Sequence, residues 1–106
     1  MYNRDEASIL LQQMMPRFKH VREGDLIFVF KYDEDDPSIL HIYARHLTTV
    51  QQAIDTWFDE DAEETWNPRR ERFETRSQTH EIYWFWLEED RRVLIITCFQ
   101  READES

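Results

Sequence analysis

Three side chains in the middle of the chain could together carry acid–base chemistry. Arg45 and His46 are adjacent and stand just before a predicted helix, and Glu74 lies in a later segment of alternating polarity. Histidine and glutamate can act as general base and general acid, and arginine can stabilise negative charge that develops on a phosphate. Cleavage of RNA without a metal needs these groups. His46, Arg45 and Glu74 therefore define an alternative function, a small metal-independent ribonuclease, beside a leading interpretation that has no catalytic residue.

The layout around these residues is similar to that of the small ribonuclease toxins of the barnase, EndoU and RelE-like group. In that group an early Arg-His strand, a helix and a closing hairpin with the pattern Ile-Thr-X-Phe or Tyr recur. Residues 40–99 here follow the same order and end in Ile96-Thr97-Cys98-Phe99. The resemblance implies a toxin-like ribonuclease. The chain departs from the group because it is strongly acidic and has no lysine near the predicted site, whereas RNA-binding proteins place basic side chains against phosphates.

The sequence gives little support for a metal site, a reactive cysteine or a phosphate-binding loop. The histidines are His20, His41, His46 and His80, and they lack the tight pairs of a structural zinc site. The acidic run Asp33–Asp36 lacks the spacing and the glycine of a calcium-binding EF-hand loop. Cys98 is the only cysteine and lies in an apolar run, which predicts a buried, inert thiol. Gly24 is the only glycine, so phosphate-cradling loops are excluded. We expect no metal and no cofactor.

The charge balance is the strongest global signal. The chain has 23 acidic residues against 13 lysines and arginines, which gives a formal charge of −10. We therefore expect no direct binding to nucleic acid. The acids gather in predicted turns, where they either keep the protein in solution or steer it towards a partner with a basic surface. The candidate steering residues are Asp33, Asp35, Asp36, Asp59, Asp61 and Glu63.

The length of 106 residues suits one domain with one modest core. We assign residues 1–100 to that domain and residues 101–106 to a polar C-terminal tail. The first residues lack the basic-then-apolar pattern of a signal peptide, and no apolar run approaches the ~20 residues that span a bilayer. We therefore expect a cytoplasmic protein that does not associate with membranes.

Hydrophobic periodicity and turn residues predict an α+β fold in the order α-β-β-α-β-β-β. The clearest helix begins at a capping box of Thr49 and Gln52 and carries an apolar stripe that ends at Phe58. We expect the acids that follow it to lie in a loop that extends to Asn67-Pro68. The predicted helices are 4–15 and 50–58, and the predicted strands are 26–30, 40–46, 70–77, 81–87 and 92–99, the last two forming a hairpin.

Short connections between these strands predict a mostly antiparallel sheet of four to five strands with the two helices on one face. The strand 81–87 has large apolar groups on both pleat faces, so aromatic side chains remain on whichever face the helices leave open. Aromatic residues with arginine, and few lysines, are typical of protein interface centres. The predicted binding residues are His41, Tyr43, Arg45, Arg72, Arg76, Trp84 and Trp86.

The leading interpretation is a small acidic protein-binding module. Its size, its charge and its lack of a catalytic signature suit an inhibitor, an antitoxin or a phage-type countermeasure that imitates a nucleic acid and docks on a basic, nucleic-acid-binding protein. The aromatic face would make the contact, and the acidic loops would steer association. A homodimeric structural subunit, in which the aromatic face pairs with its copy, is a further alternative.

Overall fold

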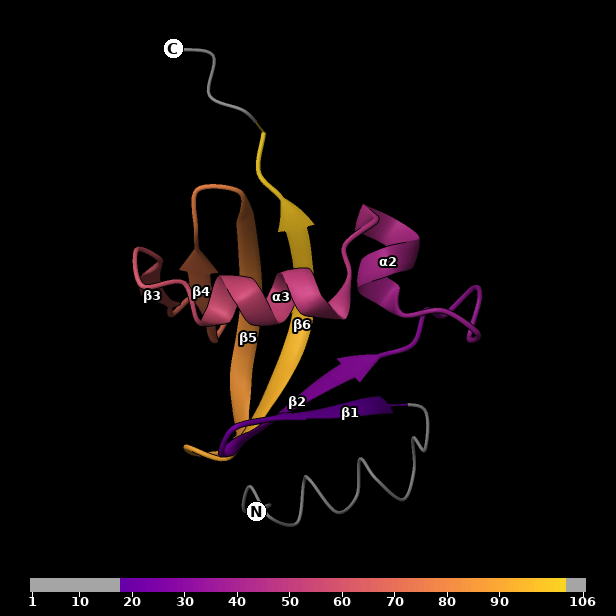
Figure 1. Ribbon diagram of the computed structural model, residues 1–106, viewed down its shortest axis with the longest axis horizontal. Coiled ribbons are helices and arrows are strands. Elements are labelled where there is room, and N and C mark those ends of the chain that lie inside the picture. The colour runs from indigo at the N-terminus through magenta and orange to yellow at the C-terminus, as the bar shows by residue number, and fades with distance from the viewer. Residues whose placement is uncertain (1–17, 103–106) are drawn as a thin grey trace.

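Six strands form one mixed sheet in residues 18–102, the part of the chain that the computed structural model describes (Figure 1). The strands stand in the order β1-β2-β6-β5-β4-β3. Two short helices, α2 (His41–His46) and α3 (Val50–Trp57), lie against this sheet. The strands are β1 (Phe18–Glu23), β2 (Leu26–Lys31), β3 (Glu63–Asn67), β4 (Arg72–Arg76), β5 (His80–Glu88) and β6 (Arg92–Gln100). The α+β class is as predicted, and the helix expected at 4–15 lies outside the described residues.

The sheet is larger than predicted and is not purely antiparallel. Strand β2 pairs with β6 in parallel, and the other pairings among the described strands are antiparallel. The prediction of four to five strands missed β1 and β3, and the expected loop up to Asn67 is in fact occupied by β3. Both missed strands stand at the edges of the sheet and are rich in charged residues. Their apolar alternation is weak because an edge strand can leave most side chains in solvent.

The segment predicted as a strand at 40–46 is the helix α2, so that prediction is wrong. Six residues are too short for the alternation of Leu40, Ile42 and Ala44 to exclude a helix. Ile42 is the residue that α2 buries against the sheet. The helix ends at Leu47, which adopts a left-handed conformation (φ 52°), and the N–H groups of Leu47 and Thr48 donate to the carbonyls of Tyr43 and Ile42. The bond from the left-handed Leu47 to the carbonyl four residues earlier is that of the αL capping motif.

Helix α3 matches its prediction closely. The Thr49 hydroxyl accepts a hydrogen bond from the Gln52 N–H at 3.1 Å, and the Gln52 side chain accepts one from the Thr49 N–H at 2.9 Å. The predicted capping box is therefore confirmed. The apolar stripe of α3 faces the sheet and buries Ala53 and Ile54. In Figure 1, α3 crosses in front of β4, β5 and β6, so it covers the central strands on one face, which we call the helix face.

The core lies on the helix face and is dominated by aromatic rings. The Trp84 ring stacks on Phe73, and the ring of Trp57 in α3 packs on Trp84 and on Trp86, with centroid distances of 4.5, 4.4 and 5.9 Å. Trp84 is 1% exposed, and its indole N–H donates to Thr75 Oγ1 at 2.8 Å. The prediction that Trp84 lies on an exposed sheet face is therefore wrong, and Trp86 lies partly buried on the same side.

The hairpin of β5 and β6 is confirmed, with one irregularity that the alternation could not reveal. The register shifts between Tyr83 and Trp84, so Tyr83 faces Thr97 while Trp84 faces Ile95. The shift lets Ile95 and Cys98 both enter the core although they are three residues apart. Bulges of this kind re-aim the side chains of a strand. Here the bulge places Thr97 and Phe99 on the face opposite the helices.

Candidate functional site

The face of the sheet opposite α2 and α3 is the candidate site, and we call it the open face. No helix of residues 18–102 lies on it, because both helices bury their apolar residues in the core on the other side. Alternation along each strand, together with the pairing register, decides which side chains project there. The central part of the open face comprises Glu63, Thr65, Arg72, Glu74, Arg76, Glu81, Tyr83, Phe85, Thr97 and Phe99.

Tyr83 is the centre of the open face. The guanidinium carbon of Arg72 lies 3.6 Å from the centroid of the Tyr83 ring, and the Phe99 ring meets Tyr83 edge-to-face at 5.2 Å. A guanidinium over an aromatic ring is held by the ring quadrupole and buries part of both groups. The three side chains are half-buried, so they present ordered apolar surface to solvent.

Two ion pairs frame this aromatic centre. Arg72 Nε donates to Glu74 Oε2 at 3.0 Å, and the Asn67 side-chain amide donates to the same oxygen at 3.0 Å. Arg76 Nε donates to Glu81 Oε1 at 2.6 Å, and the Tyr83 hydroxyl donates to Glu81 Oε2 at 3.1 Å. The network holds each charged group in one position, which lowers the entropy that a partner would have to remove on binding.

The charge states of the open face follow from these contacts. The hydrogen bond from Asn67 holds the pKa of Glu74 below its ordinary value; burial opposes this shift and Arg72 reinforces it. The pKa of Tyr83 is raised, first by burial and then by the negative charge of Glu81. The hydrogen bond to Glu81 raises the pKa of Arg76. At neutral pH Glu74 and Arg76 are therefore ionised, and the phenol of Tyr83 is neutral.

A small hollow opens beside this network. It has a volume of about 60 Å³ and is lined by Glu63, Thr65, Glu74, Arg76 and Glu81. Glu63 is exposed, and its side chain has no ion pair or hydrogen bond within residues 18–102. The lining has more carboxylates than guanidinium groups, so the hollow is suited to a cationic group.

The residues predicted on strand 40–46 do not reach the open face. His41, Tyr43 and Arg45 lie on α2, and Arg45 donates to Asp33 Oδ1 at 3.0 Å and to Asp35 Oδ2 at 2.6 Å. Their predicted place beside Arg72 and Arg76 is therefore wrong. Helix α2 contacts the open face through the ring of His46, whose centroid lies 5.8 Å from that of Phe99.

Asp33 is a structural residue and not an exposed acid as predicted. It is 4% exposed, and its carboxylate accepts hydrogen bonds from the backbone N–H groups of Asp35 and Asp36 at 3.0 and 3.1 Å. Burial by itself would raise the pKa of Asp33, but these two hydrogen bonds and Arg45 outweigh it, so the pKa lies below its ordinary value. Asp33 thus fixes the loop before α2. The other predicted steering acids, Asp35, Asp36, Asp59, Asp61 and Glu63, are exposed.

The ribonuclease grouping is not assembled in the described residues. Arg45 is engaged by Asp33 and Asp35, and Glu74 is engaged by Asn67 and Arg72. His46 meets the Phe99 ring, and Tyr83 lies between that ring and the Arg72–Glu74 pair. A general base and a general acid must both reach the reacting atoms. His46, Arg45 and Glu74 do not share such a place.

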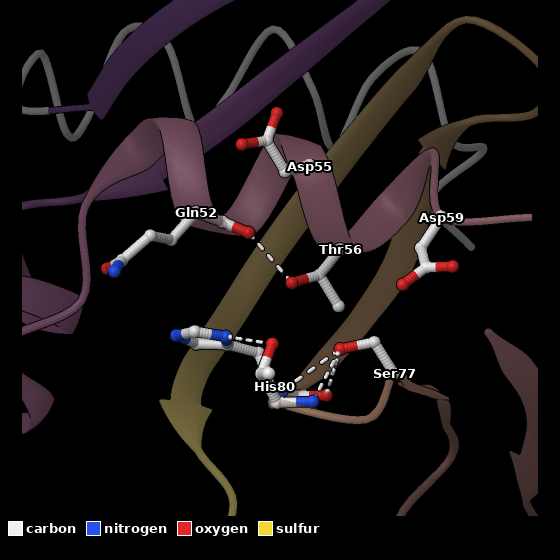
Figure 2. A pocket seen from close by; sticks show the side chains of 7 residues that line it. Gln52, Asp55, Thr56, Asp59, Ser77 and His80 are labelled. Carbon is white, nitrogen blue, oxygen red and sulfur yellow. Dashed lines mark hydrogen bonds between the residues drawn. The ribbon is translucent and has the colours of Figure 1, made fainter. Parts of the chain in front are cut away.

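A second pocket, of about 250 Å³, lies between α3 and the β4–β5 turn (Figure 2). Its polar side chains are occupied within the chain. The Thr56 hydroxyl donates to the Gln52 carbonyl at 2.7 Å, and Ser77 Oγ accepts from the N–H of His80 at 3.0 Å. The His80 ring nitrogen Nδ1 lies 2.9 Å from Thr79 Oγ1. Within residues 18–102, His80 makes no contact with a carboxylate of this pocket.

Sequence reasoning missed several residues of the open face. Glu81, Tyr83 and Phe99 were not among the predicted binding residues, and Glu63 was expected in a loop. Arg72 and Arg76 were predicted there and are there. The period-two pattern of β5 places Glu81 and Tyr83 on one face, which was a usable signal. Phe99 had no such signal, because the bulge in β6 determines its side.

Comparison with known protein families, curated proteins and solved structures finds no match to this chain. Within residues 18–102, histidine, cysteine and carboxylate side chains form no group of three or more that could hold a metal ion. No helix in that range is long and apolar enough to span a bilayer. Function is therefore inferred from the geometry of the open face.

Proposed function

We propose that the chain is a protein-binding module that docks its open face on a partner with a basic surface. The observation that carries the proposal is Tyr83, held between Arg72 and Phe99 beside a hollow that is lined mostly by carboxylates. Tyrosine and arginine are enriched among the residues that dominate protein–protein affinity. Their geometry is fixed here before binding, because the Glu74 and Glu81 carboxylates hold the arginines in place.

The hollow indicates the chemistry of the partner. Glu63 has no side-chain partner within the described residues, and the hydrogen bonds that Glu74 accepts from Asn67 and Arg72 both end on its Oε2 atom. A lysine or arginine side chain from the partner would find a free carboxylate on one side and a free carboxylate oxygen on the other. Such a charge pair contributes to affinity when water is excluded around it, and Tyr83 and Phe99 supply the surrounding apolar surface.

The overall charge supports the same partner class. A chain with a formal charge of −10 attracts basic surfaces over distances of about a Debye length, roughly 8 Å at physiological salt. Asp35, Asp59 and Asp61 lie in exposed loops and add to this field. A nucleic-acid-binding protein has a basic surface of this kind, so a module that covers it would act as an inhibitor that competes with the nucleic acid.

A pair of neighbouring residues gives a matched test. Glu63 and Glu64 are adjacent, exposed and equal in charge, but they project from opposite faces of β3, with Glu63 on the open face. We expect Glu63→Arg to lose the partner, because it places a cation at the mouth of the hollow. Glu64→Arg makes the same change of charge on the other side and should retain the partner.

The measurement is affinity capture from nuclease-treated lysate of the source cells with wild type and both variants, quantified by mass spectrometry. The proposal predicts a basic protein that wild type and Glu64→Arg recover in similar amounts and that Glu63→Arg recovers at least about tenfold less, the equivalent of 1.4 kcal/mol. Equal recovery by all three proteins would rule out the open face as the binding surface.

A further inference from the structure

The outer edge of β3 is the second surface that the structure leaves without a partner. Strand β3 stands at the end of the sheet, and no other strand of residues 18–102 pairs with its outer side (Figure 1). Four of its five residues are exposed, and among them Trp66 keeps 50% of its surface in solvent. An exposed edge strand is a template for pairing with another chain, and proteins usually blunt it with charges.

The charges around β3 are sorted by sign along the strand. Acids gather before and within its first half, at Glu60, Asp61, Glu63 and Glu64, and Arg69 and Arg70 follow its end. The two arginines are exposed, and their side chains have no acidic partner within the described residues. Asn67 Oδ1 accepts hydrogen bonds from the backbone N–H groups of Arg69 and Arg70, both at 3.1 Å, so the turn that presents them is fixed. Charges that only prevent the edge of β3 from pairing with other chains would not need opposite signs at the two ends of the strand.

We propose that β3 pairs antiparallel with β3 of a second copy of this chain, so that two sheets join across a two-fold axis. In an antiparallel pair the acidic end of one strand meets the arginine end of the other, and the same contact repeats on both sides of the axis. A parallel pair would instead bring like charges together. The proposal concerns the sheet edge and is independent of the partner that binds the open face.

The register of the pair follows from the same residues. With Thr65 on the axis, Glu63 stands opposite Asn67 of the second copy. The turn with Glu60 and Asp61, just before the strand, then lies at the same end of the pair as the second copy's turn with Arg69 and Arg70. If the axis moved one residue towards the N-terminus, Glu64 would stand opposite Glu64 of the second copy. If it moved one residue towards the C-terminus, Glu64 would stand opposite Pro68, which follows the strand and has no N–H. Thr65 on the axis avoids both conflicts.

This register also accounts for the exposure of Trp66. The two Trp66 side chains project from the helix face of their strands and become diagonal neighbours across the axis, a distance that aromatic side chains can bridge. Each ring then covers surface that it leaves in solvent in the single chain. The interface is limited to one short strand per copy, which places it among small interfaces, so we expect a dimer whose population depends on concentration.

Charge exchange between two variants tests the pair and its direction. In the first variant, Arg69→Glu and Arg70→Glu make the turns on both sides of β3 acidic. In the second, Glu60→Arg and Asp61→Arg make both of these turns basic. The exchanged side chains are exposed and have no side-chain partners within residues 18–102, so the fold should survive, which circular dichroism checks. The measurement is sedimentation velocity over a wide range of concentration at physiological ionic strength.

We expect wild type to dimerise with rising concentration and each variant alone to remain monomeric. An equimolar mixture of the two variants should dimerise again, because the acidic ends of one then meet the basic ends of the other at both sides of the axis. A wild type that stays monomeric throughout would overturn the proposal. So would a wild-type dimer that both variants retain, or a mixture that stays as monomeric as its components.

Discussion

At the scale of single residues, chemical type alone was a poor guide to position. Asp33 belongs to an acidic run that the sequence places in a solvated turn, yet its carboxylate is buried and accepts two backbone hydrogen bonds. Trp84 was expected on an exposed face and lies in the core. In both cases long-range contacts determine the outcome, Arg45 for Asp33 and the α3 residue Trp57 for Trp84. A single sequence does not reveal such contacts.

Asp33 leads to a prediction about acid stability. Because its folded-state pKa lies below the ordinary value of 3.8, its contribution to stability is present above that pH and is lost as the pH falls through the folded-state pKa. Asp33→Asn removes the charge that Arg45 and the backbone N–H groups stabilise. We expect this variant to unfold at lower urea than wild type at pH 7, and the difference in unfolding free energy to shrink as the pH falls below 3.8.

The control for this measurement is Glu34→Gln, which neutralises an exposed carboxylate in the same loop. It should have little effect on the urea midpoint at pH 7. If Asp33→Asn were as stable as wild type at neutral pH, or if the difference grew on acidification, the role given to Asp33 would be incorrect.

At the scale of elements, strong local signals were read correctly and short or exposed segments were not. Helix α3, with its capping box, and the β5–β6 hairpin were predicted because their apolar patterns run over several turns or residues. Helix α2 was predicted as a strand, because six residues fit both periods and its helical state depends on Ile42 entering the core. Strands β1 and β3 carry charged residues at the sheet edges and gave little pattern to detect.

The start of α3 allows a direct stability measurement. Thr49→Ala removes the hydroxyl that accepts from the Gln52 N–H, and loss of such a cap costs about 1 kcal/mol. We expect the urea midpoint to fall with an unchanged slope, since α3 covers the central strands and unfolds with them. Thr49→Ser keeps the acceptor oxygen and serves as the control. A Thr49→Ala protein with the midpoint of wild type would show that the capping box does not stabilise the domain.

At the scale of the whole molecule, the two faces of the sheet differ in character. The helix face holds the aromatic core beneath α3, and the opposite face holds an ordered set of aromatic and charged side chains around Tyr83. The idea of an open aromatic face came from the sequence, because β5 carries large apolar groups on both sides. The residues that make up this face could be identified only from the structure, because the strand order and the bulge in β6 bring Glu63, Arg72 and Phe99 to the same face.

The measurement that tests the binding role of this face most directly is an NMR titration of the aromatic side chains with the captured partner. Tyr83 and Phe99 report on the open face, and Trp66, which is half exposed, reports on the other face. We predict that the Tyr83 and Phe99 resonances shift or broaden as partner is added while the Trp66 indole signal stays in place. Changes at Trp66 with Tyr83 and Phe99 unmoved would contradict the account and would place recognition on the helix face.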